Sequence, residues 1–132
     1  MARVRILLAD DHKEMRDRVV RMLESEFDVL GAVKDGGALL EAALKMKPDV
    51  CVMDISMPVI SGIEDAMRLK KSGSTAKMIF LTVHDDPDFV QAALETGALG
   101  YVVKSRMASD LSVAIKGAIA GRLFISPFSA QS

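Results

Sequence analysis

The sequence has few cysteines and almost no net charge, so it lacks the features typical of disulfide-rich secreted proteins and of strongly basic nucleic-acid-binding proteins. Among 132 residues there is one cysteine, Cys51, no tryptophan, and a formal net charge of only −1. A single cysteine cannot form an internal disulfide, which fits a reducing compartment, and the apolar run around Cys51 predicts a buried, inert thiol. A charge this close to zero supplies no basic field that would draw the whole domain to nucleic acid or to a membrane surface.

Long hydrophobic segments are also lacking. The amino terminus leads directly into a short strand-like pattern, and we find neither a signal-like apolar region nor a membrane-spanning run. We therefore expect a cytoplasmic protein. Half of the residues are hydrophobic and 27% are charged, which is ordinary for a globular chain. The length suits one domain that buries roughly two-thirds of its unfolded surface.

Strand-like and helix-like patterns alternate five times along the chain. Strands are expected at residues 3–9, 27–33, 49–53, 77–82 and 100–103. Helices are expected at residues 15–23, 37–46, 61–73, 87–97 and 107–120. Two of the strand-like runs lack polar alternation, which is typical of strands covered by helices on both faces. The alternation predicts an α/β fold with a doubly wound parallel sheet.

Local signals set the expected helix boundaries. Ser61 and Glu64 form a capping box that places the start of a helix at Ser61. Asp86 is expected to cap the next helix, with Pro87 at its first position. Glycines are expected to end three helices, at Gly73, Gly97 and Gly121.

Polar residues stand at the ends of four apolar runs. Asp10 and Asp11 follow the first run, Asp54 the third, Thr82 the fourth and Lys104 the fifth. Parallel strands have their carboxyl ends at one edge of the sheet, so these side chains are expected to converge on one crevice. Three carboxylates, a hydroxyl and an ammonium suit a divalent metal and a phosphoryl group.

The acidic cluster predicts a metal site. Carboxylates of Asp10, Asp11 and Asp54 about 4 Å apart would repel by roughly 4 kcal/mol per pair at an effective dielectric near 20, and a cation would relieve this. Few carboxylates with room for water suit Mg²⁺. The alternative is that Asp11 only caps the first helix, since Glu14 follows three residues later, and that Asp10 is solvated.

Asp54 has two possible roles. It could be a third metal ligand only, or it could be a nucleophile that forms an acyl phosphate. Lys104 and the metal would then neutralise the phosphoryl oxygens, and Thr82 would donate its hydroxyl; such a transfer depends on positioning and charge. Taken singly, Lys104 is more typical of a surface lysine and Thr82 of an ordinary strand residue.

With these residues in this order, the sequence resembles the receiver domain of two-component response regulators over nearly its whole length. The residues that carry the resemblance are Asp10–Asp11, Asp54 with Met57–Pro58 and Gly62, Thr82, and Tyr101 with Lys104. The resemblance implies a flavodoxin-like (βα)5 fold over residues 1–121, with a five-stranded parallel sheet in the order 2-1-3-4-5.

The resemblance also implies site roles. Asp54 would be the phosphoacceptor, and Asp11, Asp54 and the Ser56 carbonyl would bind Mg²⁺ directly, with Asp10 binding through water. A histidine kinase would donate the phosphoryl group, and the only chemistry would be the protein's own phosphoryl transfer and autodephosphorylation.

A switch is implied at the ends of the fourth and fifth strands. Thr82 and Lys104 would sense the phosphoryl group, and Tyr101 would turn inward to report activation, unless Tyr101 is simply a core aromatic. The face made by the fourth helix, fifth strand and fifth helix would be remodelled, with homodimerisation on phosphorylation. His84, two residues after Thr82, is expected near the mouth of the site as a solvated loop residue. The alternative that the resemblance implies is a position that influences how readily water attacks the acyl phosphate.

The end of the sequence is similar to the NarL/FixJ branch of the family. His12 and residues 121–127 carry this likeness, and members of the branch usually continue into a helix-turn-helix output domain. Residues 122–132 are therefore expected to begin a linker, with DNA bound only through the missing domain to regulate transcription.

Two other classes of function compete with the signalling switch. The chain could be a stand-alone receiver or pseudo-receiver that acts only as a protein-binding module. It could also be a hydrolase with a phosphoaspartate intermediate, although the acidic pair and Asp54 belong to different strands and no substrate cap is evident. Neither a phosphate loop for flavin, a dinucleotide fingerprint nor a Walker motif is present.

Overall fold

The computed structural model describes residues 3–55, 59–83 and 87–126. Its strands form one sheet in the order β2-β1-β3-β4-β5-β6, with every pair parallel. The strands are β1 (Arg5–Ala9), β2 (Asp28–Val33), β3 (Val50–Ile55), β4 (Lys77–Thr82), β5 (Gly100–Val103) and β6 (Phe124–Ile125). The order 2-1-3-4-5 that the family resemblance implies is confirmed for the first five strands.

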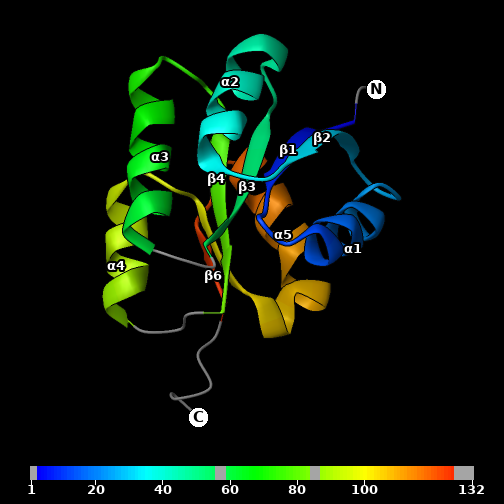
Figure 1. Ribbon diagram of the computed structural model, residues 1–132. Coiled ribbons are helices and arrows are strands. Elements are labelled where there is room, and N and C mark those ends of the chain that lie inside the picture. Colours follow the sequence, from blue (N-terminus) through cyan, green and yellow to red (C-terminus); the bar gives the residue numbers. More distant parts are fainter. Residues whose placement is uncertain (1–2, 56–58, 84–86, 127–132) are drawn as a thin grey trace.

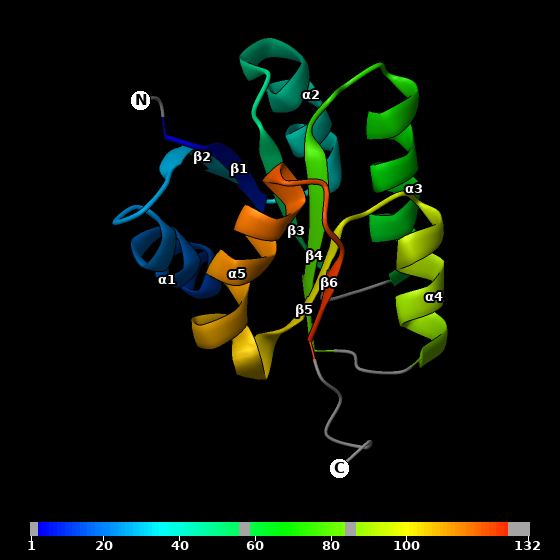
Figure 2. The ribbon, with the colours of Figure 1, turned by 180° about the vertical axis from the view of Figure 1, so that it is seen from behind.

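Helices cover both faces of the sheet. They are α1 (Lys13–Leu23), α2 (Gly36–Met46), α3 (Val59–Lys71), α4 (Pro87–Glu95), the short 3-10 helix η1 (Lys104–Arg106) and α5 (Met107–Ile119). Helices α1 and α5 lie on one face, and α2, α3 and α4 lie on the other (Figures 1 and 2). This is the doubly wound arrangement that the alternating pattern predicts.

Each face of the sheet has its own apolar core. Leu7, Phe80 and Tyr101 belong to the cluster that includes residues of α2, α3 and α4. Ile6 and Ile79 belong to the cluster that includes residues of α1 and α5. Neighbouring residues of a strand point to opposite faces, so both must be apolar when helices cover both sides. This explains the uninterrupted apolar runs in the sequence.

Cys51 is fully buried in the first of these clusters. Burial disfavours the charged thiolate and raises the pKa of the Cys51 thiol to about 12. The thiol therefore stays protonated at physiological pH, as expected for an inert core cysteine.

Several element boundaries differ from the expected ones, and those of β3 and α3 concern residues singled out in the sequence. Strand β3 continues to Ile55, so Asp54 lies inside the strand, because the ladder with β4 extends through the pairs Asp54↔Leu81 and Ile55↔Thr82. Helix α3 begins at Val59, which places Ser61 within its first turn and not at the N-cap position. The capping-box pattern located the first turn correctly but not the boundary.

The proline expected to start a helix and the glycines expected to end helices lie at those positions in the structure. Pro87 is the first residue of α4, while its expected cap, Asp86, lies outside the described residues. Gly73, Gly97 and Gly121 follow helices with φ angles of 89°, 88° and 77°. These left-handed angles favour glycine because it has no Cβ.

The sheet has a sixth strand that the sequence pattern did not reveal. Phe124 and Ile125 pair in parallel with Gly100 and Tyr101 of β5 (Figure 2). A two-residue strand has too few positions to show a period, and it forms only because β5 presents an open edge. Residues 124–125, expected to lie in a linker, therefore belong to the sheet.

Within the described ranges, none of the helices combines the length and the hydropathy needed to cross a lipid bilayer.

Candidate functional site

Four neighbouring strands bring the predicted site residues to one edge of the sheet. Asp10 directly follows β1, Asp54 is the penultimate residue of β3, Thr82 is the last residue of β4 and Lys104 directly follows β5. Because all four strands run in the same direction, their carboxyl ends coincide. The register between strands aligns them further, since Thr82 pairs with Ile55 on one side and Val103 on the other.

The acidic residues form one cluster. Asp10, Asp11, His12 and Asp54 each offer a ligand atom, and these atoms lie within 4.8 Å of one another. Asp10 is only 1% exposed, so the interpretation of Asp10 as a solvated residue is wrong. The cap position of α1 is His12, without a side-chain cap hydrogen bond, so Asp11 is not the N-cap. His12 was expected only as a marker of the family branch, yet its position next to the acidic pair brings its ring to the cluster.

Two carboxylate oxygens in the cluster are buried and meet no donor from residues 3–55, 59–83 or 87–126. Asp10 Oδ1 accepts a hydrogen bond of 2.9 Å from the His12 backbone N–H. In the described part of the chain, Asp10 Oδ2 and Asp54 Oδ1 have no hydrogen-bond partner. Leaving such groups unsatisfied costs about 1–3 kcal/mol each, so a proton or a cation is favoured between them. The carboxylate oxygens fit a hard divalent cation such as Mg²⁺.

The protonation of Asp54 reflects this crowding. Burial and the neighbouring Asp10 carboxyl raise the pKa of Asp54 to about 7, although the Lys104 ammonium opposes the rise. The dominant effect is desolvation, since the Asp54 side chain is fully buried. A cation bound to the cluster would favour the ionised carboxylate that a nucleophile requires.

Lys104, the first residue of η1 after β5, extends its side chain to Asp54 in the cluster. Its Nζ donates to Asp54 Oδ2, and its side chain is 12% exposed. Thr82 and Tyr101 are both buried, and Tyr101 packs in the first apolar cluster. Tyr101 is thus a core aromatic in this conformation, and its role as a switch stays a prediction.

Some predicted positions are not among the described residues. Ser56, expected to offer its carbonyl to Mg²⁺, falls outside them, as do Met57–Pro58 and His84.

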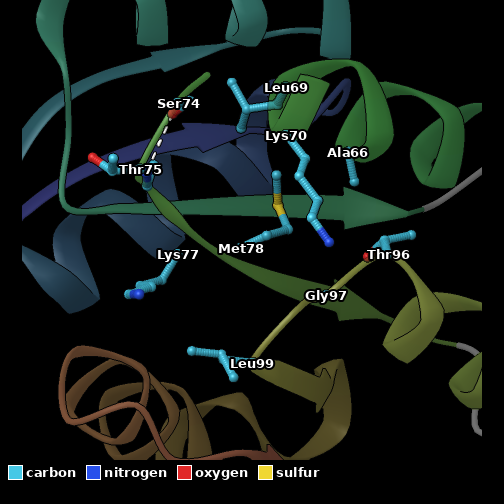
Figure 3. Close-up of a pocket in the computed structure, with 11 residues that line it drawn as sticks. Ala66, Leu69, Lys70, Ser74, Thr75, Lys77, Met78, Thr96, Gly97 and Leu99 are labelled. Carbon is cyan, nitrogen blue, oxygen red and sulfur yellow. Dashed lines mark hydrogen bonds between the residues drawn. The ribbon is translucent and has the colours of Figure 1, made fainter. Parts of the chain in front are cut away.

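A separate pocket lies at the other end of the strands, where β4 and β5 begin. It has a volume of about 470 Å³ and is lined by residues that include Lys70, Ser74, Lys77 and Thr96 (Figure 3). Two of its hydroxyls are engaged with the backbone: Thr96 Oγ1 donates to Ala93 O at 2.6 Å, and Ser74 Oγ accepts from the Ala76 N–H at 3.2 Å. None of the predicted site residues lines this pocket.

Comparison with known proteins gives the family. The sequence profile of the response regulator receiver domain matches residues 6–116, and the chain therefore belongs to the response regulator receiver domain family. It is 37% identical over 126 residues to the uncharacterized transcriptional regulatory protein YvfU of Bacillus subtilis (strain 168), covering 94% of this chain and 63% of that protein. It is also 37% identical over 127 residues to the transcriptional regulatory protein DegU of Brevibacillus brevis, covering 95% of this chain and 54% of that protein.

Solved structures agree with this assignment. A two-component response regulator of the LuxR family from Aurantimonas sp. SI85-9A1 superposes with a TM-score of 0.90 at 33% identity, covering 98% of this chain and 94% of that one. The isolated receiver domain of RcsB from Salmonella enterica serovar Typhimurium, with the phosphomimetic BeF3−, gives a TM-score of 0.85 at 25% identity, covering 98% and 97%. The chain spans between one half and two thirds of the length of the curated relatives above.

Proposed function

We propose that this chain is a phosphorylation-controlled switch in which Asp54 accepts a phosphoryl group from a histidine kinase. The observation that carries the proposal is the buried Asp54 carboxylate, held by Lys104 and clustered with Asp10 and Asp11. A buried, unsatisfied oxygen at a crowded anionic site is unfavourable for folding alone, and such strain is typical of functional sites. A constitutive binding module would not need it.

The chemistry requires little beyond positioning. A carboxylate oxygen of Asp54 attacks phosphorus, the P–N bond of the kinase phosphohistidine breaks, and the electron pair remains on the imidazole nitrogen. Lys104 holds the carboxylate in place and offsets the negative charge of the incoming oxygens, while Thr82 would donate its hydroxyl to one of them. Later attack of water on phosphorus releases inorganic phosphate and restores Asp54.

Asp10, Asp11 and Asp54 would hold Mg²⁺ at this site, with a water between the ion and Asp10. The ion would supply charge neutralisation for the phosphoryl oxygens. We also propose that the Ser56 carbonyl completes the ligand set.

A direct test uses the chain as it stands. Incubation with acetyl phosphate and Mg²⁺ is expected to add the mass of one phosphoryl group, and EDTA is expected to prevent the gain because the carboxylates then repel the donor. Intact-protein mass spectrometry reads the result. If the protein gains no mass under conditions that label another receiver domain, the chain is not a phosphoacceptor.

The output is proposed to be dimerisation and control of an attached DNA-binding domain. The relatives named above are described as transcriptional regulators, and this chain is shorter than they are. We infer that residues 1–121 form the body of the receiver, to whose sheet residues 124–125 add β6. We also infer that residues 122–132 lead to a helix-turn-helix domain, and that the protein works in the cytoplasm. Ile119, which is 45% exposed on α5, is available for a dimer or output contact.

Thr82 is proposed to couple the phosphoryl group to Tyr101 and to the face made by α4, β5 and α5. A swing from 1:99 to 99:1 between two states needs about 5.5 kcal/mol of differential stabilisation, which new phosphoryl contacts must supply. Thr82→Ala is therefore expected to take up the phosphoryl group more slowly but still to be labelled, and to lose dimerisation induced by beryllium fluoride, measured by analytical ultracentrifugation.

The matched control for this coupling is Thr96→Ala. Thr96 is also a buried threonine, but it lies at the other end of the strands. It should dimerise like the unchanged protein. Dimerisation of Thr82→Ala at the unchanged level would show that Thr82 does not carry the signal.

A further inference from the structure

A buried polar network joins η1, α5 and the residue after β6. Asp110 on α5 and Ser126 after β6 are only 6% and 1% exposed. Ser126 Oγ donates to Asp110 Oδ2 at 2.8 Å, and Arg106 Nε donates to the same oxygen at 2.9 Å. Ser109 Oγ donates to the other oxygen of Asp110 at 2.9 Å. Three donors thus converge on one buried carboxylate.

The network contacts residues on either side of Lys104 in the sequence, Val103 and Arg106. The N–H of Val103, the residue before Lys104, donates to Ser126 Oγ at 3.2 Å. Arg106, two residues after Lys104, ends the 3-10 helix that begins at Lys104. Asp110 is therefore connected to the backbone before Lys104 through Ser126, and to the turn after it through Arg106.

The hydrogen bonds of the network stabilise the ionised form of the Asp110 carboxylate. Burial acts to raise the pKa of Asp110, but the hydrogen bonds from Ser126, Arg106 and Ser109 outweigh it and hold the pKa below its usual value. Hydrogen bonds to an ionised acceptor are shorter and stronger than neutral ones. The turn that carries Lys104 is consequently held by charge-assisted bonds as well as by its own single turn of 3-10 helix.

We propose that Asp110 and Ser126 are positioning residues for Lys104, and that the same bonds make the β6 segment part of the phosphoryl site's support. The proposal rests on the function proposed above. By fixing η1, the two residues hold the Lys104 ammonium at Asp54. Coupling of this kind is reciprocal: a phosphoryl group that tightens Lys104 must tighten β6 by the same free energy.

The reciprocal effect is measurable without any substitution. Phe124 N–H donates to Leu99 O and Ser126 N–H to Tyr101 O, both at 2.9 Å, so hydrogen exchange at these two amides reports on β6. Beryllium fluoride with Mg²⁺ is expected to slow their exchange by about tenfold, equal to about 1.4 kcal/mol. Unchanged exchange at both amides, with beryllium fluoride bound, would overturn the link to β6.

Substitution tests the positioning role. Ser126→Ala removes the hydroxyl that joins Val103 to Asp110, and it is expected to slow phosphoryl uptake from acetyl phosphate by about tenfold, since the loss of one hydrogen bond to a charged group is of this size. Ser126→Thr, which keeps the hydroxyl, should stay near the unchanged rate. Ser112→Ala is the matched control: Ser112 lies on α5, the helix that carries Asp110, and its hydroxyl donates to Glu26 Oε1 at the surface at 2.6 Å.

A double-mutant cycle with Lys104→Met separates positioning from general support of the fold. If Ser126 acts through Lys104, Ser126→Ala should have almost no further effect on the rate once the ammonium is gone. If the same tenfold loss persists without Lys104, or if Ser126→Ala alone leaves the rate unchanged, the positioning role is wrong. Absence of uptake by the unchanged protein would instead contradict the proposed function.

Discussion

Asp54→Asn is expected to abolish phosphoryl uptake and, at the same time, to stabilise the fold at alkaline pH. Asparagine has no nucleophilic carboxylate, so acetyl phosphate with Mg²⁺ should add no mass. Its neutral amide removes the charge that burial and Asp10 make unfavourable, and its N–H groups can donate to Asp10 Oδ2, which is otherwise without a donor in the described part of the chain.

The pH dependence gives this prediction its sign. The pKa of Asp54 is raised from 3.8 to about 7 in the folded protein, so the folded state binds a proton that the unfolded chain has released between these values. The unchanged protein therefore loses stability as pH rises through this window. Asp54→Asn should match it near pH 4 and exceed it at pH 8, by on the order of 2 kcal/mol.

Denaturant unfolding at pH 4, 6 and 8 measures this difference in the absence of divalent cations. Asp17→Asn is the control, because Asp17 is a half-exposed carboxylate on α1 that bonds Lys13. It should leave uptake unchanged and show no alkaline stabilisation. Equal stability of the Asp54 variant and the unchanged protein at pH 8 would mean that the carboxylate is not crowded as described.

Lys104→Met is expected to slow phosphoryl uptake by about 100-fold. It removes the ammonium that is held in place to stabilise the negative charge on the oxygens of the phosphoryl group during transfer. It should also destabilise the fold at pH 8 by about 3 kcal/mol, since the loss of one partner leaves a buried, unpaired carboxylate. The loss should be smaller near pH 5, where Asp54 takes up a proton.

Lys116→Met provides the comparison. Lys116 lies on α5 and pairs with Glu26, but its side chain is 59% exposed. An exposed pair contributes at most about 1 kcal/mol, so this variant should behave like the unchanged protein in both assays. A loss of stability in Lys104→Met that is the same at pH 5 and pH 8 would indicate lost packing and not an unpaired charge.

Much of the candidate site was predictable because its residues are attached to strong local patterns. Asp10, Thr82 and Lys104 each stand at the end of a buried apolar run, and parallel strands share their carboxyl edge. Strand order then follows from the family resemblance. The sequence pattern placed the end of β3 before Asp54, because the apolar run stops there. In the structure, hydrogen bonding to β4 continues the strand to Ile55.

Other features depend on contacts that no local pattern contains. Asp54 joins Asp10 and Asp11 in one cluster only because β1 pairs with β3. Strand β6 exists only as an addition to the edge of β5. Asp110 and Ser126 look like an ordinary helix residue and an ordinary tail residue, and only the return of the chain along β5 buries them together.

The sequence by itself determined the alternation of strands and helices, the two apolar faces of the sheet and the edge at which the carboxylates gather, because each depends on short-range periodicity. The tertiary structure alone decided which carboxylate oxygens among the described residues lack a donor, that burial raises the pKa of Asp54, and that Ser126 is bonded to the residue before Lys104. Those properties arise from burial and from hydrogen bonds between distant segments, so they exist only once the chain has folded.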